Sequence, residues 1–198
     1  SDGLIDAFNN VPMGMTAERI AQKYAISRDE KDRFALHSQQ KAEAAIAAGR
    51  FAGEIVPVDV TERRHTRRVD TDEHPTLGST LEALAALRPA FDKAGTVTAG
   101  NASGINDGAA AVIVVSERAL RDRNLTPLAR IASYASSGLE PMEMGLGPVG
   151  ASRRALERAG WTAADVDLIE LNEAFAAQSI AVIRDMGWDP ERINVNGG

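Results

Sequence analysis

The sequence of 198 residues contains no cysteine. The chain can therefore form no disulfide bond, and it carries no thiolate that could attack a substrate or bind a metal. We predict no metal site. Its longest apolar run, residues 109–115, is far shorter than the roughly 20 residues that cross a bilayer. No basic and then apolar segment of the secretory kind opens the sequence. These absences predict a cytoplasmic protein without a membrane contact.

Positive charge is scarce relative to negative charge. Lysine and arginine number 22 against 28 aspartates and glutamates, which gives a formal net charge of -6. We do not expect such an acidic chain to bind nucleic acid. Hydrophobic residues make up 44% and charged residues 25%, the balance of a globular protein with one large domain or two small ones.

The most distinctive stretch runs from Thr98 to Val115. Residues 98–111 are small and polar and include three glycines, which permit left-handed backbone and close approach of a ligand. Residues 112–115 are Val-Ile-Val-Val, the pattern of a strand that is buried on both faces. Two interpretations stay open: a loop that presents backbone donors to a ligand, or an ordinary turn before a strand.

Helix signals dominate the first fifty residues. Thr16 is suited to cap a helix that reaches about Tyr24. Ser27 and Glu30 have the spacing of a capping box, in which a hydroxyl and a carboxylate each satisfy a free amide. The helix that follows is predicted to continue as far as a left-handed Gly49. Its packing stripe is predicted to consist of Phe34, Ser38, Ala42 and Ala45.

A basic segment, Arg63–Arg68, follows a strand predicted over residues 54–60, where Pro57 favours an edge position. Two interpretations are open for the arginines: a solvated hairpin tip, or a site for phosphate groups, which guanidinium ions pair with. A short helix is then predicted over residues 80–87, ended by Pro89.

Helices and strands alternate in the second half of the chain, which is typical of an α/β layer. Helices are predicted at 117–123, 147–160 and 174–186, and strands at 128–134, 166–170 and 193–195. The helix at 147–160 has proline near its start and glycine at its end, the usual asymmetry.

The segment Asn172–Phe175 falls where a predicted strand ends and a helix begins. Ligands of open α/β sheets bind at this edge, where helix N-termini also present free amides. The Asn172 amide could donate to a carbonyl oxygen or hold a water, and Glu173 could act as an acid or base. The alternative is that both residues only cap the helix.

Five short motifs, in this order along the chain, resemble those of the thiolase family. They are Met13-Gly14-Met15-Thr16-Ala17-Glu18, Arg88-Pro89-Ala90-Phe91-Asp92, residues 99–110 (Ala-Gly-Asn-Ala-Ser-Gly-Ile-Asn-Asp-Gly-Ala-Ala), Asn172-Glu173-Ala174-Phe175 and Asn194-Val195-Asn196-Gly197-Gly198. The resemblance covers the chain from end to end and implies a central piece of a thiolase. Two positions depart from some members: Pro12 stands in place of histidine, and Thr76 in place of arginine.

The resemblance implies an α/β fold, part of the thiolase-type layered fold. Residues 1–106 would form the loop domain and connecting segments that cover coenzyme A, and residues 107–198 would form part of the C-terminal α/β domain. The basic segment Arg63–Arg68 would then lie in the loop domain.

The resemblance also implies acyl transfer between coenzyme A thioesters. 3-Ketoacyl-CoA and CoA would give acyl-CoA and acetyl-CoA, or the reverse condensation would occur. Asn172 would be catalytic, because it would fix a water in an oxyanion hole. The residues expected to contact the CoA or acyl group are Met13, Phe91, Ala99, Ser103, Met144, Ala174 and Phe175. Coenzyme A would be a substrate, with no further cofactor, and the complete protein would be a homodimer or homotetramer.

Thiolases use two cysteines and one histidine, and none of them matches this chain. The nucleophilic cysteine would precede it, and a Gly-His-Pro segment and the second cysteine would follow it. We interpret His37, His65 and His74 as surface residues. The chain alone is therefore expected to be inactive. Two alternatives are a catalytically silent thiolase-like protein that binds CoA or a partner, and a ketoacyl-synthase relative, in which Asn172–Phe175 would not be expected.

Overall fold

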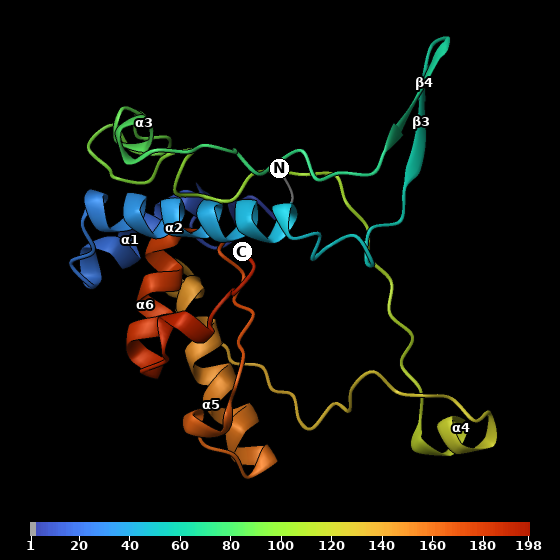
Figure 1. Cartoon of the computed structure of the whole chain (residues 1–198). Coiled ribbons are helices and arrows are strands. Elements are labelled where there is room, and N and C mark those ends of the chain that lie inside the picture. Colours follow the sequence, from blue (N-terminus) through green and yellow to red (C-terminus); the bar gives the residue numbers. More distant parts are fainter. Residues whose placement is uncertain (1–2) are drawn as a thin grey trace.

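Three helices form the centre of the computed structural model, which describes residues 3–198. The helices α1, α2 and α6 pack together, and α5 extends away below them (Figure 1). The elements in chain order are β1 (Ile5–Asp6), β2 (Val11–Pro12), α1 (Met13–Lys23), α2 (Arg28–Ala47), β3 (Val58–Glu62), β4 (His65–Val69), α3 (Leu81–Ala85), α4 (Glu117–Asp122), η1 (Pro141–Leu146), α5 (Gly147–Ala159), η2 (Ala163–Asp165), α6 (Ala176–Met186) and η3 (Pro190–Arg192).

Helix α1 begins at Met13, four residues before the start that a Thr16 cap would give. Pro12 precedes its first residue, Met13, and the hydroxyl of Thr16 donates to the Met13 carbonyl oxygen at 2.7 Å. The prediction that Thr16 caps this helix is therefore wrong. Thr16 is buried in the first turn instead, where its hydroxyl bonds the backbone of its own helix.

Helix α2 is the long helix that the sequence predicts. The Ser27 hydroxyl accepts from the Glu30 amide at 3.1 Å, which confirms half of the capping box. The Glu30 carboxylate does not complete the box, because it pairs with Arg184 on α6. The helix is followed by Gly49 at φ 67°, as predicted. Of the predicted packing stripe, Ser38 is buried and so is Ala45.

Among the residues that the structure describes, two small apolar clusters on either side of α6 form the core. One joins α1, η1 and α6, and its members are Ile20, Ile26, Leu146, Ile180 and Ala181. The other joins α5 and α6 to the segments on either side of α6, and its members are Val149, Leu171, Val182 and Ile193. Burial of these side chains holds α6 in place, and the loop before α6 contributes to the site described below.

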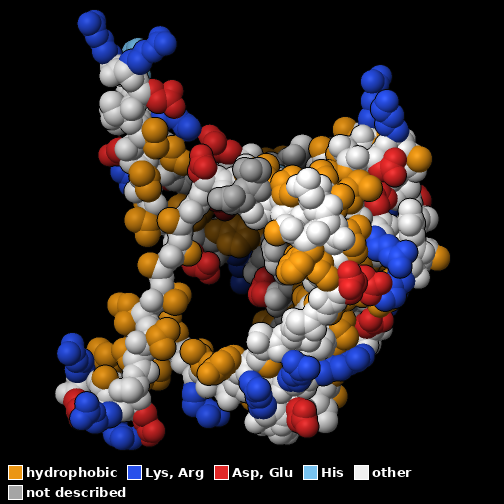
Figure 2. Space-filling view, turned by 180° about the vertical axis from the view of Figure 1, so that it is seen from behind, with side chains coloured by type: hydrophobic (Ala, Val, Ile, Leu, Met, Phe, Trp, Pro, Cys, Tyr) orange, Lys and Arg blue, Asp and Glu red, His pale blue; other side chains and the backbone are white. Residues whose placement is uncertain are grey.

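The basic segment forms the end of a two-stranded hairpin. Strands β3 and β4 are antiparallel with Val60 opposite Arg67, and Arg63 takes the turn at φ 55°. The first strand starts at Val58, four residues later than predicted, after Pro57. The residues of Arg63–Arg68 are exposed, and basic side chains stand at the end of the hairpin (Figure 2). The solvated hairpin tip is thus confirmed, and a phosphate site here stays a prediction.

Residues 105–140 form an extended arm that carries α4 (Figure 1). The strands predicted at 112–115 and 128–134 are not formed, and Val112 and Ile113 are 88% and 92% exposed. A strand needs hydrogen bonds from a neighbouring strand. Within residues 3–198, no strand pairs with either segment. Orange hydrophobic side chains consequently stand along the arm (Figure 2).

The last third of the chain matches the prediction in its helices but not in its strands. Helix α5 has Pro148 in its first turn and ends at Ala159, before the left-handed Gly160 with φ 70°. The strands predicted at 166–170 and 193–195 are reduced to one parallel bridge, between Ile169 and Ile193. Across the described residues, no helix is long and apolar enough to cross a membrane.

Candidate functional site

A cleft of about 420 Å³ lies between α1, η1 and the loop that leads into α6. Six of the predicted site residues line it together: Met13, Ser103, Met144, Asn172, Ala174 and Phe175. They come from four separate parts of the sequence. Every described residue that lines the cleft is uncharged. Such a cleft suits an uncharged chain or acyl group better than a phosphate.

Two predicted residues do not line this cleft. The Phe91 ring stands edge-on to Phe175, with the ring centroids 6.1 Å apart and the planes at 78°. It therefore contacts the cleft wall at Phe175 without lining the cleft. Its other neighbour is the backbone of Gly14, where a Cβ would collide with the Phe91 ring. Ala99 is exposed and lies outside the cleft lining.

Asn101 fixes the loop that carries Ser103. Its buried carboxamide accepts from the Thr98 amide at 2.9 Å and donates to Asp32 of α2 at 2.8 Å. The backbone carbonyl oxygen of Asn101 accepts from the amide of Ala176, the first residue of α6, at 3.0 Å. Two residues later, the Ser103 amide donates to the Ala174 carbonyl at 2.9 Å. This pairing places Ser103 beside the loop 172–175.

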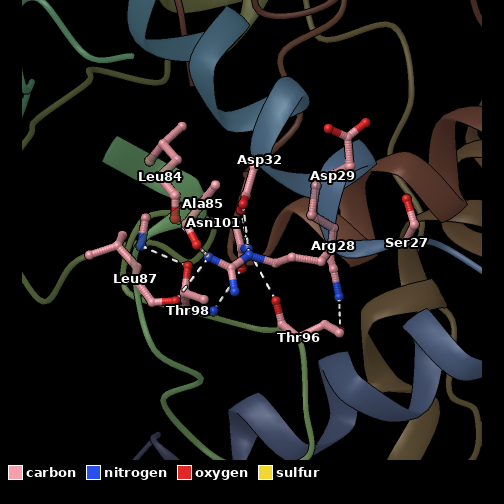
Figure 3. Close-up of polar contacts among 12 residues, drawn as sticks. Ser27, Arg28, Asp29, Asp32, Leu84, Ala85, Leu87, Thr96, Thr98 and Asn101 are labelled. Carbon is pink, nitrogen blue, oxygen red and sulfur yellow. Dashed lines mark hydrogen bonds and ion pairs between the residues drawn. The ribbon is translucent and has the colours of Figure 1, made fainter. Parts of the chain in front are cut away.

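Arg28 connects the same part of α2 to α3 (Figure 3). Its guanidinium donates to the carbonyl oxygens of Leu84 at 2.6 Å and Leu87 at 3.0 Å. It also pairs with Asp32 at 2.7 Å, so the aspartate is held from two sides, by Arg28 and Asn101. A carboxylate that is fully buried needs such partners.

A second buried network, centred on Glu18, holds the start of the same loop. The Glu18 carboxylate accepts from the amides of Thr96 and Val97, each at 2.7 Å. Lys31 of α2 donates to the Thr96 hydroxyl. Burial lowers the pKa of Lys31, and the nearby carboxylates of Glu18 and Asp32 oppose this shift. The loop 96–103 therefore rests on charged groups of both α1 and α2.

Asn172 is exposed in the cleft wall and does not cap a helix. Helix α6 begins four residues later, at Ala176, after Phe175, and no side chain in the described part of the chain caps it. The capping interpretation of Asn172 and Glu173 is therefore wrong. Among residues 3–198, no group hydrogen-bonds the Asn172 carboxamide, which leaves its N–H groups available to a ligand or a water.

Glu173 and Leu171, the two neighbours of Asn172, are both held by Asn194. The Asn194 carboxamide accepts from the Leu171 amide and donates to the Leu171 carbonyl, each at 2.7 Å. It also donates to the Glu173 carboxylate at 2.7 Å. Asn194 is 2% exposed, with φ at 45°. Glu173 is thus a partner of Asn194.

A smaller cavity of about 190 Å³ lies on the other side of Asn172, which lines both. Its lining is more polar and includes Ser38, Glu173 and His74. The interpretation of His37, His65 and His74 as surface residues agrees with their exposure. His74 differs from the other two because it also lines this cavity.

Sequence reasoning missed several residues of the site. Gln178 and Thr16 line the cleft, and Gln178 is only 5% exposed. A signal existed for Gln178, because it is a polar residue within the apolar run of α6. Asp32 gave no such signal. Glu18 and Asn101 lie in quoted motifs, but their role depends on contacts between segments that are distant in sequence.

The chain matches two family profiles. Residues 1–118 match the N-terminal domain of thiolase, and residues 125–198 match the C-terminal domain. The division predicted at residues 106 and 107 stays a prediction.

Curated relatives match over the whole chain. The acetyl-CoA acetyltransferase of Paracoccus denitrificans is 63% identical over 100% of this chain and 50% of its own length. That of Escherichia coli (strain K12) is 59% identical, also over 100% of this chain and 50% of its own length. The chain thus spans about half the length of the curated relatives it matches.

Solved structures likewise match nearly all of this chain over about half of their own length. The acetyl-CoA acetyltransferase of Bacillus anthracis superposes with a TM-score of 0.96 at 47% identity, over 98% of this chain and 50% of that one. Human mitochondrial 3-ketoacyl-CoA thiolase in complex with CoA superposes with a TM-score of 0.93 at 50% identity, over 98% and 48% respectively. The chain belongs to the thiolase family.

Proposed function

We propose that the complete protein transfers acyl groups between coenzyme A thioesters, and that this chain supplies part of the active site. The reaction is thiolysis of 3-ketoacyl-CoA by CoA, giving acyl-CoA and acetyl-CoA, or the reverse condensation. The observation that carries the proposal is the uncharged cleft in which six residues predicted from the sequence meet. Membership of the thiolase family supports the same reaction.

The shape and polarity of the cleft suit the end of a thioester. Met13, Met144 and Phe175 offer apolar surface for an acyl group, while Ser103 offers a hydroxyl to the amide-containing pantetheine chain. Phe91 supports this wall through Phe175. We propose no direct contact for Ala99, which lies outside the cleft lining.

Asn172 is proposed to stabilise negative charge on the thioester oxygen. When a nucleophile attacks the carbonyl carbon, the oxygen becomes an oxyanion, and a preorganised N–H donor lowers the barrier. The Asn172 carboxamide can act directly or through a water, because it lines the cleft and has no hydrogen-bond partner among residues 3–198. The nucleophilic thiol and its histidine base would come from outside this chain.

The absence of cysteine favours a second candidate for the chain by itself. With no thiolate and no matched histidine, it would bind a CoA thioester without turning it over. The same would hold for the complete protein if its remaining residues lacked these groups.

Thiolytic cleavage of acetoacetyl-CoA tests both candidates. We expect turnover by the complete protein and none by the 198-residue chain, with intact mass verified for each sample. Absence of turnover by the complete protein together with CoA binding would replace the first candidate by the second. Enzymatic turnover by the chain alone would refute the requirement for a thiol.

A further inference from the structure

Asn194 lies behind the cleft wall, where a short parallel pairing of the backbone ends. Upstream of it, Ile169 and Ile193 form the bridge, and the Asn194 amide donates to the Ile169 carbonyl at 2.9 Å. The backbone then turns away, because Asn194 has φ 45°. A left-handed residue cannot continue a strand, so the next main-chain donor and acceptor for Leu171 are missing.

The Asn194 side chain supplies the missing groups. A carboxamide has the same donor and acceptor as a peptide, and here it accepts from the Leu171 amide and donates to the Leu171 carbonyl. Its second N–H donates to Glu173. One buried side chain thereby holds the residues on both sides of Asn172, and asparagine tolerates the left-handed conformation better than most residues do.

The turn that carries Asn194 is itself fixed to α2. Lys41 donates to the Ile193 carbonyl at 2.9 Å, and the Ser38 hydroxyl bonds both the amide and the carbonyl of Gly198 at 3.1 Å. Gly197 has φ 85°, and a Cβ there would lie 2.7 Å from the Ala42 Cβ. The backbone therefore lies directly on the helix and gives Asn194 little freedom to move.

We propose that Asn194 is a positioning residue that aims the Asn172 carboxamide at the reacting carbonyl oxygen. This inference rests on the proposed function of Asn172. Asn194 does not line the cleft, so it acts only through the backbone of Leu171 and the side chain of Glu173. Loss of its hydrogen bonds would let the loop 171–173 move, while Met13, Met144 and Phe175 keep their places in the cleft.

Asn194→Asp in the complete protein removes two of the three hydrogen bonds at almost constant volume. The new carboxylate can still accept from the Leu171 amide, but it cannot donate to the Leu171 carbonyl, and it repels Glu173. Displacement of a catalytic group by about 1 Å costs up to a hundredfold in rate, and we expect kcat to fall at least roughly tenfold. KM should stay within about twofold, because the cleft contacts are retained.

Two further variants separate positioning from general damage. Glu173→Gln in the Asn194→Asp background returns a donor to the pair, so part of the lost kcat should be recovered. In an Asn172→Ala background, Asn194→Asp should change kcat by less than about twofold, because the group that it positions is already gone. A purely structural role would lower kcat by a similar factor in both backgrounds.

Asn124→Asp is the matched control. Asn124 is also left-handed, with φ 49°, but it is exposed and lies next to α4, far along the arm. Its replacement should leave kcat and KM unchanged. It controls for the chemistry of the substitution and for the backbone conformation of the replaced residue.

Hydrogen exchange gives a readout that does not need turnover. Mass spectrometry of the complete protein should show that peptides covering residues 169–175 exchange their amide hydrogens faster in Asn194→Asp than in wild type. Adding Glu173→Gln to Asn194→Asp should slow this exchange again. Unchanged exchange would overturn the positioning role, whatever the kinetics. Faster exchange combined with normal turnover in Asn172→Ala would keep the contact but refute the proposed role of Asn172. Equal loss of kcat in the wild-type and Asn172→Ala backgrounds would overturn positioning through Asn172.

Discussion

Replacing Asn172 by alanine and by aspartate in the complete protein tests the proposed oxyanion donor. Asn172 is exposed, caps no helix and has no hydrogen-bond partner within residues 3–198. Its removal should therefore change the free energy of unfolding by no more than about 0.5 kcal/mol. Loss of one preorganised donor should cost about 3 kcal/mol of transition-state stabilisation, or roughly a hundredfold in kcat.

Asn172→Asp separates an effect on catalysis from an effect on stability more sharply. Its side chain has nearly the same size, but it places a negative charge where negative charge develops on the substrate. We expect melting close to wild type and almost no turnover. The assay pairs a melting curve with kcat for thiolysis of acetoacetyl-CoA, and Asn124→Asp serves as the control. Near-normal kcat in Asn172→Asp would refute the proposed role, and a large fall in melting temperature would show a structural role instead.

Three other predictions concern the contact between Gly14 and Phe91, the charge of Lys31 and the exposed arm. Gly14→Ala should displace the Phe91 ring and destabilise the protein by about 1–3 kcal/mol, measured by denaturant unfolding, whereas an unchanged midpoint would mean that the ring moves freely. The pKa of Lys31 is lowered in the folded state, so at alkaline pH the unfolded state holds more protons than the folded state. Wild type should therefore gain stability relative to Lys31→Met as the pH rises towards 10.5. A difference in melting temperature between the two proteins that does not change with pH would contradict this. The 198-residue chain should self-associate through its exposed arm, as measured by light scattering. The double substitution Val112→Lys with Val114→Lys should reduce this association, whereas two lysine substitutions on α4 should not.

Helices α2 and α5 were predictable because their signals are local. Ser27 and Gly49 mark the two ends of α2, and Pro148 and Gly160 mark those of α5. The strand predicted at residues 112–115 is absent for a physical reason: these residues have the composition of a buried strand, but composition does not supply a partner. Strand formation depends on a second segment, and none of the described residues offers one.

The candidate site was predictable from the family resemblance: five of its six predicted cleft residues lie in the quoted motifs, and Met144 lies outside them. Met13, Ser103, Met144, Asn172, Ala174 and Phe175 meet in one cleft, as the resemblance implies. The groups that hold them were not predictable. Asp32 and Asn101 are 69 residues apart in sequence, and their role depends on a contact that no local pattern indicates.

Helix α2 sets the spacing between the two walls of the site. Asp32 holds the loop that carries Ser103, while Ser38 holds the turn that carries Asn194. Six residues of helix separate these two attachment points by about 9 Å, at 1.5 Å per residue. The distance between the walls is therefore set by the rise of one helix. A residue inserted between Asp32 and Ser38 would turn one attachment about 100° away from the other, so the site would lose its geometry without any change in the residues that touch the substrate.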